Sequence, residues 1–209
     1  MKNIFCKKTL QFMLFSFVIV ALSGCGWMYQ SHNNSNTKAS ADISSAELMV
    51  PTFSFTNQAG QSFGSEELKG QYWLANLIFT RCPSVCGLMT PNMRNIQNTM
   101  LEKGIDIKLV SFTVDPDFDT PEVLSVYGKN NGADFEHWLF LTGYSKDEIT
   151  EFAREAFQTI VMDTENDIIH GTSFFLMDGE GQVIRRYDGV SSDQSSVIAD
   201  IEAVYRNAK

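Results

Sequence analysis

Cysteine and histidine are scarce in this chain, and so are basic side chains. Its 209 residues include four cysteines, three histidines, and 16 lysines or arginines against 25 aspartates or glutamates. The formal net charge of −9 argues against binding to nucleic acid or to anionic lipid headgroups, because both require clustered Lys and Arg. No Ser-His-Asp order, phosphate-binding loop or paired-carboxylate signature is evident, so hydrolysis and nucleotide chemistry lack support.

The first 25 residues have the pattern of an export signal. Three lysines lie in residues 1–8, an apolar stretch follows at 12–22, and Leu22-Ser23-Gly24-Cys25 resembles a bacterial lipobox. The apolar stretch is shorter than the ~20 residues that span a bilayer, so a permanent transmembrane helix is the weaker interpretation. We expect residues 1–24 to be a lipoprotein signal peptide, lost together with Cys6. Acyl chains on Cys25 would then anchor the protein to the outer, extracytoplasmic face of a bacterial cell membrane.

The rest of the chain divides into a tether and one domain. Residues 26–47 are polar and lack apolar periodicity, which predicts a flexible tether over 25–47 that includes a solvated His32. Residues 48–209 have the length of a single domain and contain no internal repeat. Their apolar patterns predict strands that alternate with helices, and hence an α/β fold with a central sheet flanked by helices. The expected elements are a hairpin at 53–63, strands at 73–79, 105–114 and 138–141, helices at 90–103, from 120 and at 145–157, a closing hairpin at 173–187, and a helix at 197–205.

Cys82 and Cys86 are the only cysteines that remain after the lipobox. They follow the buried strand that ends near Phe79, at the sheet edge where open α/β sheets bind ligands. We expect Cys82 near the cap of the next helix and Pro83 in its first turn, where free backbone amides favour thiolates. Two thiols at this spacing fit one metal ion or a disulfide. A purely structural disulfide is the alternative, but a link across three residues restrains the unfolded chain very little.

Several separated segments resemble the Sco or SenC family, whose members are thioredoxin-like copper proteins that help to assemble the dinuclear copper centre of cytochrome c oxidase. The matching segments are Phe79-Thr80-Arg81-Cys82-Pro83-Ser84-Val85-Cys86, Ser111-Phe112-Thr113-Val114-Asp115-Pro116, Asp119-Thr120-Pro121-Glu122, Phe140-Leu141-Thr142-Gly143, and His170 before the strand 173–178. The resemblance implies a thioredoxin-like fold with an N-terminal hairpin extension. It also implies copper ligation by Cys82, Cys86 and His170. Gly87 departs from the family pattern, in which a proline usually follows the second cysteine.

The ligand chemistry agrees with copper. Two thiolates and one imidazole form a soft donor set, in which sulfur satisfies Cu(I) and nitrogen favours Cu(II). A structural zinc site normally has four protein ligands, and we assign no ligand role to His137. Met89 and Met93 are interpreted as core residues. Asp115 is left open, either as a group that tunes a cysteine pKa or a partner's charge, or as the start of a turn.

Two classes of function follow. The first is a non-enzymatic, membrane-tethered metallochaperone that passes copper to the copper-bearing subunit of cytochrome c oxidase. The second is a thiol-disulfide oxidoreductase, in which Cys82 attacks and Cys86 resolves, acting on the oxidase's copper-ligand cysteines and itself served by a thiol-disulfide reductant. Oxidation of the same pair would also allow a redox sensor. Peroxide reduction lacks its active-site pattern.

Overall fold

The computed structural model describes residues 40–207. The expected signal peptide, the lipobox with Cys25, Cys6, His32 and most of the tether lie outside the described residues. Within residues 40–207, no helix combines the length and the apolar character needed to cross a bilayer.

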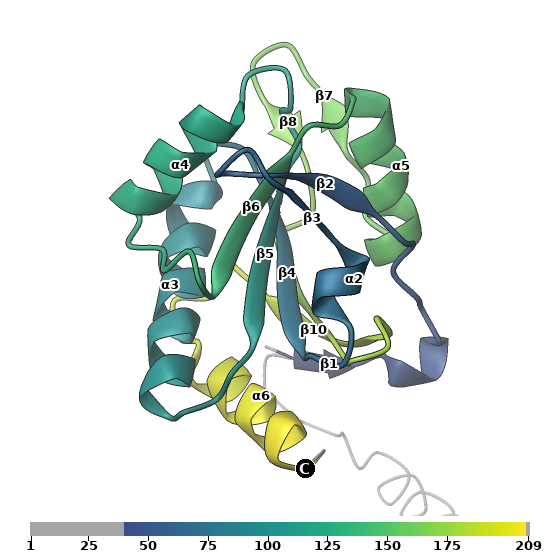
Figure 1. The fold of residues 1–209 in the computed structure, drawn as a ribbon, viewed down its shortest axis with the longest axis vertical. Coiled ribbons are helices and arrows are strands. Elements are labelled where there is room, and N and C mark those ends of the chain that lie inside the picture. The colour runs from purple at the N-terminus through teal and green to yellow at the C-terminus, as the bar shows by residue number, and fades with distance from the viewer. Residues whose placement is uncertain (1–39, 208–209) are drawn as a thin grey trace, which may run out of the picture. The chain divides into compact units, whose positions relative to one another are not determined.

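A mixed eight-stranded sheet forms the centre of the fold (Figure 1). Its strands β4, β5 and β6 are parallel neighbours, and β9 pairs antiparallel with β4 on the other side. The carboxyl ends of β4 to β6 therefore lie at the same edge of the sheet as the amino end of β9. The order is β1 (Ser40–Asp42), β10 (Val183–Asp188), β9 (Ser173–Met177), β4 (Trp73–Ile78), β5 (Lys108–Thr113), β6 (Trp138–Thr142), β2 (Ser54–Asn57) and β3 (Ser62–Gly64).

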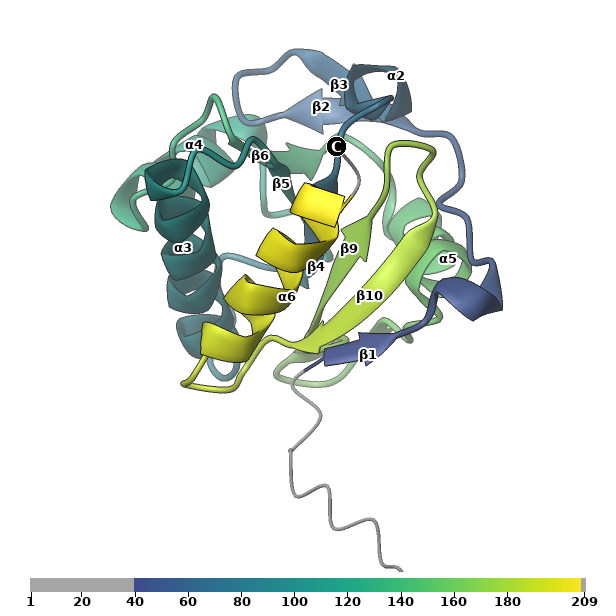
Figure 2. The ribbon, with the colours of Figure 1, turned by 90° about the horizontal axis from the view of Figure 1, so that it is seen from below.

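Helices cover both faces of this sheet (Figures 1 and 2). Helices α3 (Cys86–Glu102), α4 (Pro121–Asn130) and α6 (Ser195–Asn207) share one face, because their apolar side chains pack in one cluster. Helix α5 (Lys146–Phe157) and the short α2 (Ser65–Leu68) contribute to the cluster on the other face. A separate small hairpin of β7 (Met162–Asp163) and β8 (Ile168–Ile169) follows α5, and a 3-10 turn at Ser44–Ala46 follows β1.

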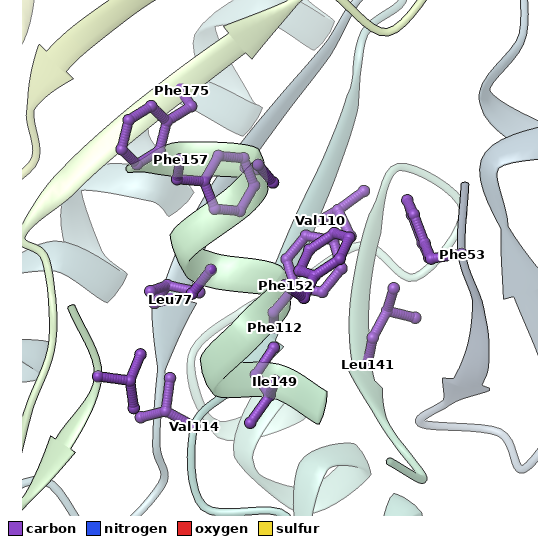
Figure 3. Close-up of a cluster of buried hydrophobic side chains, with 14 of the residues drawn as sticks. Phe53, Leu77, Val110, Phe112, Val114, Leu141, Ile149, Phe152, Phe157 and Phe175 are labelled. Carbon is purple, nitrogen blue, oxygen red and sulfur yellow. The ribbon is translucent and has the colours of Figure 1, made fainter. Parts of the chain in front are cut away.

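Strand β4 is buried on both faces, as its apolar run predicts. Alternate side chains of a strand point to opposite faces, so Leu74 and Ile78 join the α3-side core while Ala75 and Leu77 join the α5-side core. The α5-side core is rich in aromatic rings, and Figure 3 shows Phe112, Phe152, Phe157 and Phe175 together there. With both faces covered, the central strands form a rigid support for the loops at their carboxyl ends.

The expected α/β architecture is present, and the β2–β3 hairpin extends the sheet beyond β6. The predicted tether is too long, however. Ser40–Asp42 forms β1, which pairs antiparallel with β10 in the register Ser40↔Tyr187, so the folded part begins before residue 48. An edge strand is held by backbone hydrogen bonds and does not need an apolar face, which is why its polar sequence gave no signal.

Helix α5 begins with a capping box at Ser145, the residue where the helix was expected to start. The Ser145 hydroxyl accepts from the Glu148 amide at 3.2 Å, and the Glu148 carboxylate accepts from the Ser145 amide at 2.7 Å. We expect Ser145→Ala to lower the free energy of unfolding by about 1 kcal/mol, measured by urea denaturation. Ser196→Ala, at an exposed helical serine, is the matched control and should change it by less than about 0.5 kcal/mol. Equal losses in the two variants would contradict the capping role.

Candidate metal centre

The two cysteines lie on different kinds of backbone. Strand β4 ends at Ile78, and a turn closed by the Cys82 amide on the Phe79 carbonyl at 3.3 Å follows it. Helix α3 begins at Cys86 with Val85 as its cap, three residues later than a cap at Cys82 would place it. The prediction that places Cys82 at the helix cap and Pro83 in its first turn is therefore wrong, because the chain makes a separate turn before the helix starts. Cys82 is half-buried in this loop, whereas Cys86 is buried at the first helical position.

His170 reaches the cysteines through the pairing of β9 with β4. Because these strands run antiparallel, the segment that leads into β9 arrives where β4 ends. The ligand atoms of Cys82, Cys86 and His170 all lie within 4.8 Å of one another. Cys86 Sγ lies 3.8 Å from His170 Nε2. The structure thus brings together all three residues that the sequence predicts as copper ligands.

The hydrogen bonds of His170 determine which ring nitrogen is free. Its Nδ1 lies 2.9 Å from the Gly171 carbonyl oxygen, which can only accept, so Nδ1 carries the proton in the neutral ring. The lone pair of Nε2 then faces Cys86. The ring is 9% exposed and contacts the Phe79 ring edge to face at 5.7 Å. Burial lowers the pKa of His170, which favours the neutral, ligand-competent form.

The two thiols differ in acidity. Burial opposes ionisation of Cys82, but the backbone amides of Cys86 and Ser84 outweigh it, and the pKa of Cys82 is lowered. Burial raises the pKa of Cys86 far above that of an ordinary thiol, and the neighbouring Cys82 raises it further. The expectation that free helix amides favour the thiolate therefore applies to Cys82. Cys86 is a neutral thiol whose proton can be donated to His170 Nε2.

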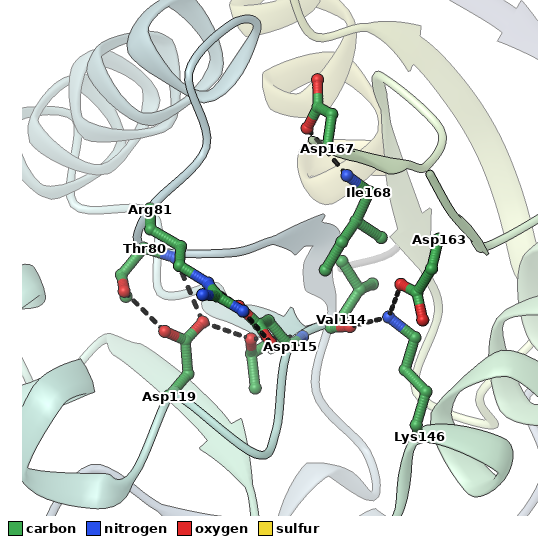
Figure 4. Close-up of polar contacts among 10 residues, drawn as sticks. Thr80, Arg81, Val114, Asp115, Asp119, Lys146, Asp163, Asp167 and Ile168 are labelled. Carbon is green, nitrogen blue, oxygen red and sulfur yellow. Dashed lines mark hydrogen bonds and ion pairs between the residues drawn. The ribbon is translucent and has the colours of Figure 1, made fainter. Parts of the chain in front are cut away.

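An ion pair lies beside the cysteine turn (Figure 4). Asp115 accepts from Arg81 Nε at 2.6 Å and from Arg81 Nη2 at 3.2 Å, and the guanidinium lies 4.7 Å from the centre of the Phe118 ring. The Asp115 carbonyl also accepts from the amides of Phe118 and Asp119, which makes it the start of the turn toward α4. The turn interpretation of Asp115 is confirmed. Its carboxylate is directed to the side chain that precedes Cys82.

Sequence reasoning missed a second carboxylate in the same region. Asp119 accepts from the Thr80 amide at 3.1 Å, from the Thr80 hydroxyl at 2.5 Å, and from the Thr113 hydroxyl at 2.5 Å (Figure 4). Burial raises the pKa of Asp119, and these hydrogen bonds oppose that rise. Thr80 and Asp119 are 39 residues apart, so no local spacing rule could have paired them.

A cleft of about 390 Å³ opens next to this turn. Arg81 and Asp115 line one side, and residues 163–168 of the β7–β8 hairpin line the other (Figure 4). Lys146 donates to the Val114 carbonyl at 2.7 Å and to Asp163 at 2.5 Å, which ties the hairpin to the end of β5. The hairpin that leads to His170 is thereby held against the sheet edge, and the cleft is lined by Arg81, the residue that precedes Cys82.

The other candidate ligands are placed elsewhere. Met89 and Met93 have no exposed surface and pack in the α3-side core, as expected. His137 lies at the start of β6, where its Nδ1 is 2.9 Å from Asp134 Oδ2. Within residues 40–207, it belongs to a separate group of donors with Asp134 and Glu136 and not to the cysteine site.

The fold and the site define a thioredoxin-like domain that carries a Cys-x₃-Cys pair and a distal histidine at the carboxyl edge of its sheet. The family model SCO1/SenC matches residues 41–206, and the chain belongs to this family.

Bacterial relatives agree with this assignment. The SCO1 protein homolog of Bacillus subtilis is 40% identical over 157 residues, which cover 74% of this chain and 81% of the relative. Among solved structures, a SCO1/SenC family lipoprotein from Bacillus anthracis is 42% identical with a TM-score of 0.72, and the match covers 75% of this chain and 95% of that one. BsSco, a member of the Sco family of cytochrome c oxidase assembly proteins in which a disulfide switch was identified, is 38% identical with a TM-score of 0.70, over 76% and 94% of the two chains. The expected family and thioredoxin-like fold are confirmed.

Proposed function

We propose that this protein is a copper metallochaperone for cytochrome c oxidase. Cys82, Cys86 and His170 hold the ion, and the protein delivers it to the copper-bearing subunit. The observation that carries the proposal is the convergence of two sulfurs and one imidazole nitrogen within 4.8 Å. Membership of the SCO1/SenC family supports the oxidase as the destination, because the related BsSco belongs to a family of oxidase assembly proteins.

The donor set fits copper better than zinc. Thiolate sulfur is a preferred ligand of Cu(I), and the His170 nitrogen suits Cu(II). The group contains three donors among the described residues, whereas structural zinc sites normally use four protein ligands. Because Nδ1 of His170 is held by the Gly171 carbonyl, Nε2 meets the ion without a change of tautomer.

The different environments of the cysteines assign them different roles. Cys82 is half-buried, whereas Cys86 is buried, and the pKa of Cys82 is lowered, so its thiolate meets the incoming ion first. Copper then displaces the proton of the buried Cys86, because a thiol must be deprotonated to become a ligand. Release begins at the same ligand. A thiolate of the acceptor replaces Cys82, the accessible ligand, before Cys86 and His170 dissociate from the ion. This ligand exchange transfers no electrons.

The location follows from the N-terminal motif. Acylation of Cys25 would anchor the domain at the outer face of the cell membrane, where the copper-bearing part of an oxidase is exposed. The lipoprotein from Bacillus anthracis, which shares 42% identity, supports such an anchor.

A second function is favoured by the asymmetry of the two thiols. As an oxidoreductase, the Cys82 thiolate would attack a partner's disulfide and form a mixed disulfide. Cys86, once deprotonated, would then displace the partner's sulfur and close the Cys82–Cys86 disulfide, so that two electrons pass to the partner. The disulfide switch of the related BsSco supports this alternative, and a sensor role would use the same oxidation.

The two functions differ in their need for His170, which is a ligand in the chaperone and has no role in the thiol-disulfide reaction. We expect His170→Ala to weaken Cu(II) binding by at least about 100-fold, since loss of an outer-shell partner alone costs 10- to 100-fold. Cu(I) affinity should fall less, because both thiolates remain. The measurement is copper titration of the reduced full chain in detergent, followed by thiolate-to-copper absorption and electron paramagnetic resonance.

His137→Ala is the matched control, because it removes a histidine that lies outside the cysteine group. It should bind one copper as the parent does. Failure of the reduced parent to bind either copper ion stoichiometrically would refute the chaperone proposal and favour the oxidoreductase. Parent-like Cu(II) spectra in His170→Ala would remove the histidine from the ligand set.

A further inference from the structure

Asp119 is the most deeply buried carboxylate among residues 40–207. Its exposed fraction is 0%, compared with 6% for Asp115, the other buried acid. Arg81 neutralises Asp115, but no ion pair in the described part of the chain includes Asp119. Burial of a carboxylate without a cationic partner is unfavourable unless hydrogen bonds satisfy its oxygens. The hydrogen bonds of Asp119 therefore show what this group does.

All of its side-chain hydrogen bonds are directed at the ends of the two central strands. Oδ1 accepts from the Thr80 hydroxyl, and Oδ2 accepts from both the Thr80 amide and the Thr113 hydroxyl (Figure 4). The Thr113 hydroxyl oxygen in turn accepts from the Asp115 amide at 3.0 Å. One carboxylate thus joins the loop after β4 to the loop after β5.

Thr80 is the residue through which this network reaches the thiols. It lies inside the turn that is closed by the Cys82 amide on the Phe79 carbonyl, two residues before Cys82. Helix α3 fixes Cys86 independently, because Cys86 is already helical. The distance between the two sulfurs therefore depends on the position of the turn. Asp119 holds the turn at Thr80 by hydrogen bonds to both its backbone amide and its hydroxyl.

We propose that Asp119 is the positioning residue of Cys82: by holding Thr80 it keeps the Cys82 sulfur within reach of Cys86 and His170. Asp119 does not bind the metal. It keeps two thiols at close range, which favours both a shared ion and a disulfide. The copper consequence rests on the proposed function, whereas the disulfide consequence does not.

Asp119→Asn is the direct test. The neutral amide oxygen replaces a charged acceptor for the Thr80 amide and the Thr113 hydroxyl, so these hydrogen bonds lose about half of their strength. The Thr80 hydroxyl, which donates to Oδ1 in the parent, must turn to accept from the new NH2 group. With the turn loosened, we expect copper affinity to fall about 10- to 100-fold, as it does when an outer-shell partner is lost. The equilibrium constant for Cys82–Cys86 disulfide formation against glutathione should fall about tenfold, which corresponds to about 30 mV for two electrons.

The experiment uses the full chain in detergent, with the disulfide quantified by mass spectrometry of the peptide that contains Cys82 and Cys86. Thr80→Val removes the hydroxyl at nearly constant shape and should shift both quantities in the same direction. Thr80→Ser restores the hydroxyl and should return both toward the parent. Gln58→Ala removes another buried acceptor, the one bound to the Phe140 amide at 2.9 Å, and controls for a general loss of stability.

The outcomes are distinct. Parent-like copper affinity and disulfide equilibrium in Asp119→Asn would overturn the proposal, even if that variant melts at a lower temperature. Equal shifts in Gln58→Ala would overturn it as well, because they would reflect destabilisation alone. If Asp119→Asn does not fold, the contrast between Thr80→Val and Thr80→Ser decides. If the parent binds no copper, the proposed function fails, and the glutathione equilibrium still decides the role of Asp119.

Discussion

The Cys86→Ser variant is expected to lose stoichiometric binding of both Cu(I) and Cu(II). Cys86 is buried at the start of α3, with its sulfur 3.8 Å from His170 Nε2 and beside Cys82. A serine hydroxyl is a hard donor that stays protonated at neutral pH, and is therefore a poor ligand for copper in either state. Only Cys82 and His170 would remain.

The titration is made on the reduced full chain, with Cu(I) in competition with a chelator and Cu(II) followed by thiolate-to-copper absorption. Ser84→Ala is the matched control. Its hydroxyl lies 3.7 Å from Cys82 Sγ, so the variant changes the surroundings of the site and leaves every proposed ligand in place. It should bind one copper. One-copper binding by a folded Cys86→Ser protein would place the ion elsewhere and contradict the assignment.

The same variant separates chaperone from oxidoreductase. Without Cys86, a mixed disulfide between Cys82 and a partner cannot be resolved, and the partner stays covalently attached. Accumulation of such an adduct with a disulfide substrate, together with absent copper binding in the parent, would identify the thiol reaction as the main activity. Copper binding that is lost in Cys86→Ser, without an adduct, supports the chaperone.

Local patterns in the sequence predict most of the fold. The run at 73–79 becomes a fully buried strand, and Ser145 caps α5, because burial on both faces and helix capping depend on neighbouring residues. Strand β1 and the β7–β8 hairpin were not predicted. Both are short and polar or exposed, and tertiary pairing rather than side-chain periodicity makes them.

The residues of the site differ in how directly the sequence predicts their role. The spacing of Cys82 and Cys86 after a buried strand indicates thiol chemistry directly. His170 becomes a candidate only through strand order and family resemblance, because 84 residues separate it from Cys86. The true start of α3, the two different thiol environments and the contact of Asp119 with Thr80 depend on how loops pack, which no local pattern encodes.

The aromatic cluster on the α5 side of the sheet supports the strands from which the site loops extend, and Phe112 lies at its centre. Phe112 lies in the middle of the sheet with no exposed surface, and its ring centre is 5.0 to 6.3 Å from those of Phe53, Phe55, Phe152 and Phe157. We expect Phe112→Ala to lower the free energy of unfolding by about 3–5 kcal/mol, because it removes buried apolar area and leaves a cavity that four surrounding rings cannot fill. Urea denaturation of the reduced, metal-free protein measures the change.

Phe118→Ala deletes the same side chain six residues further along, where the ring is 46% exposed and contacts Arg81. It should cost about 0.5–1 kcal/mol, the value of an exposed contact between a cation and an aromatic ring. Because both variants remove one phenyl group, the difference between their free energies of unfolding reports the effect of burial and not of residue type. Similar losses in the two variants would mean that the α5-side core closes around the cavity. In that case the aromatic cluster would not be the rigid support on which the spacing of Cys82, Cys86 and His170 depends.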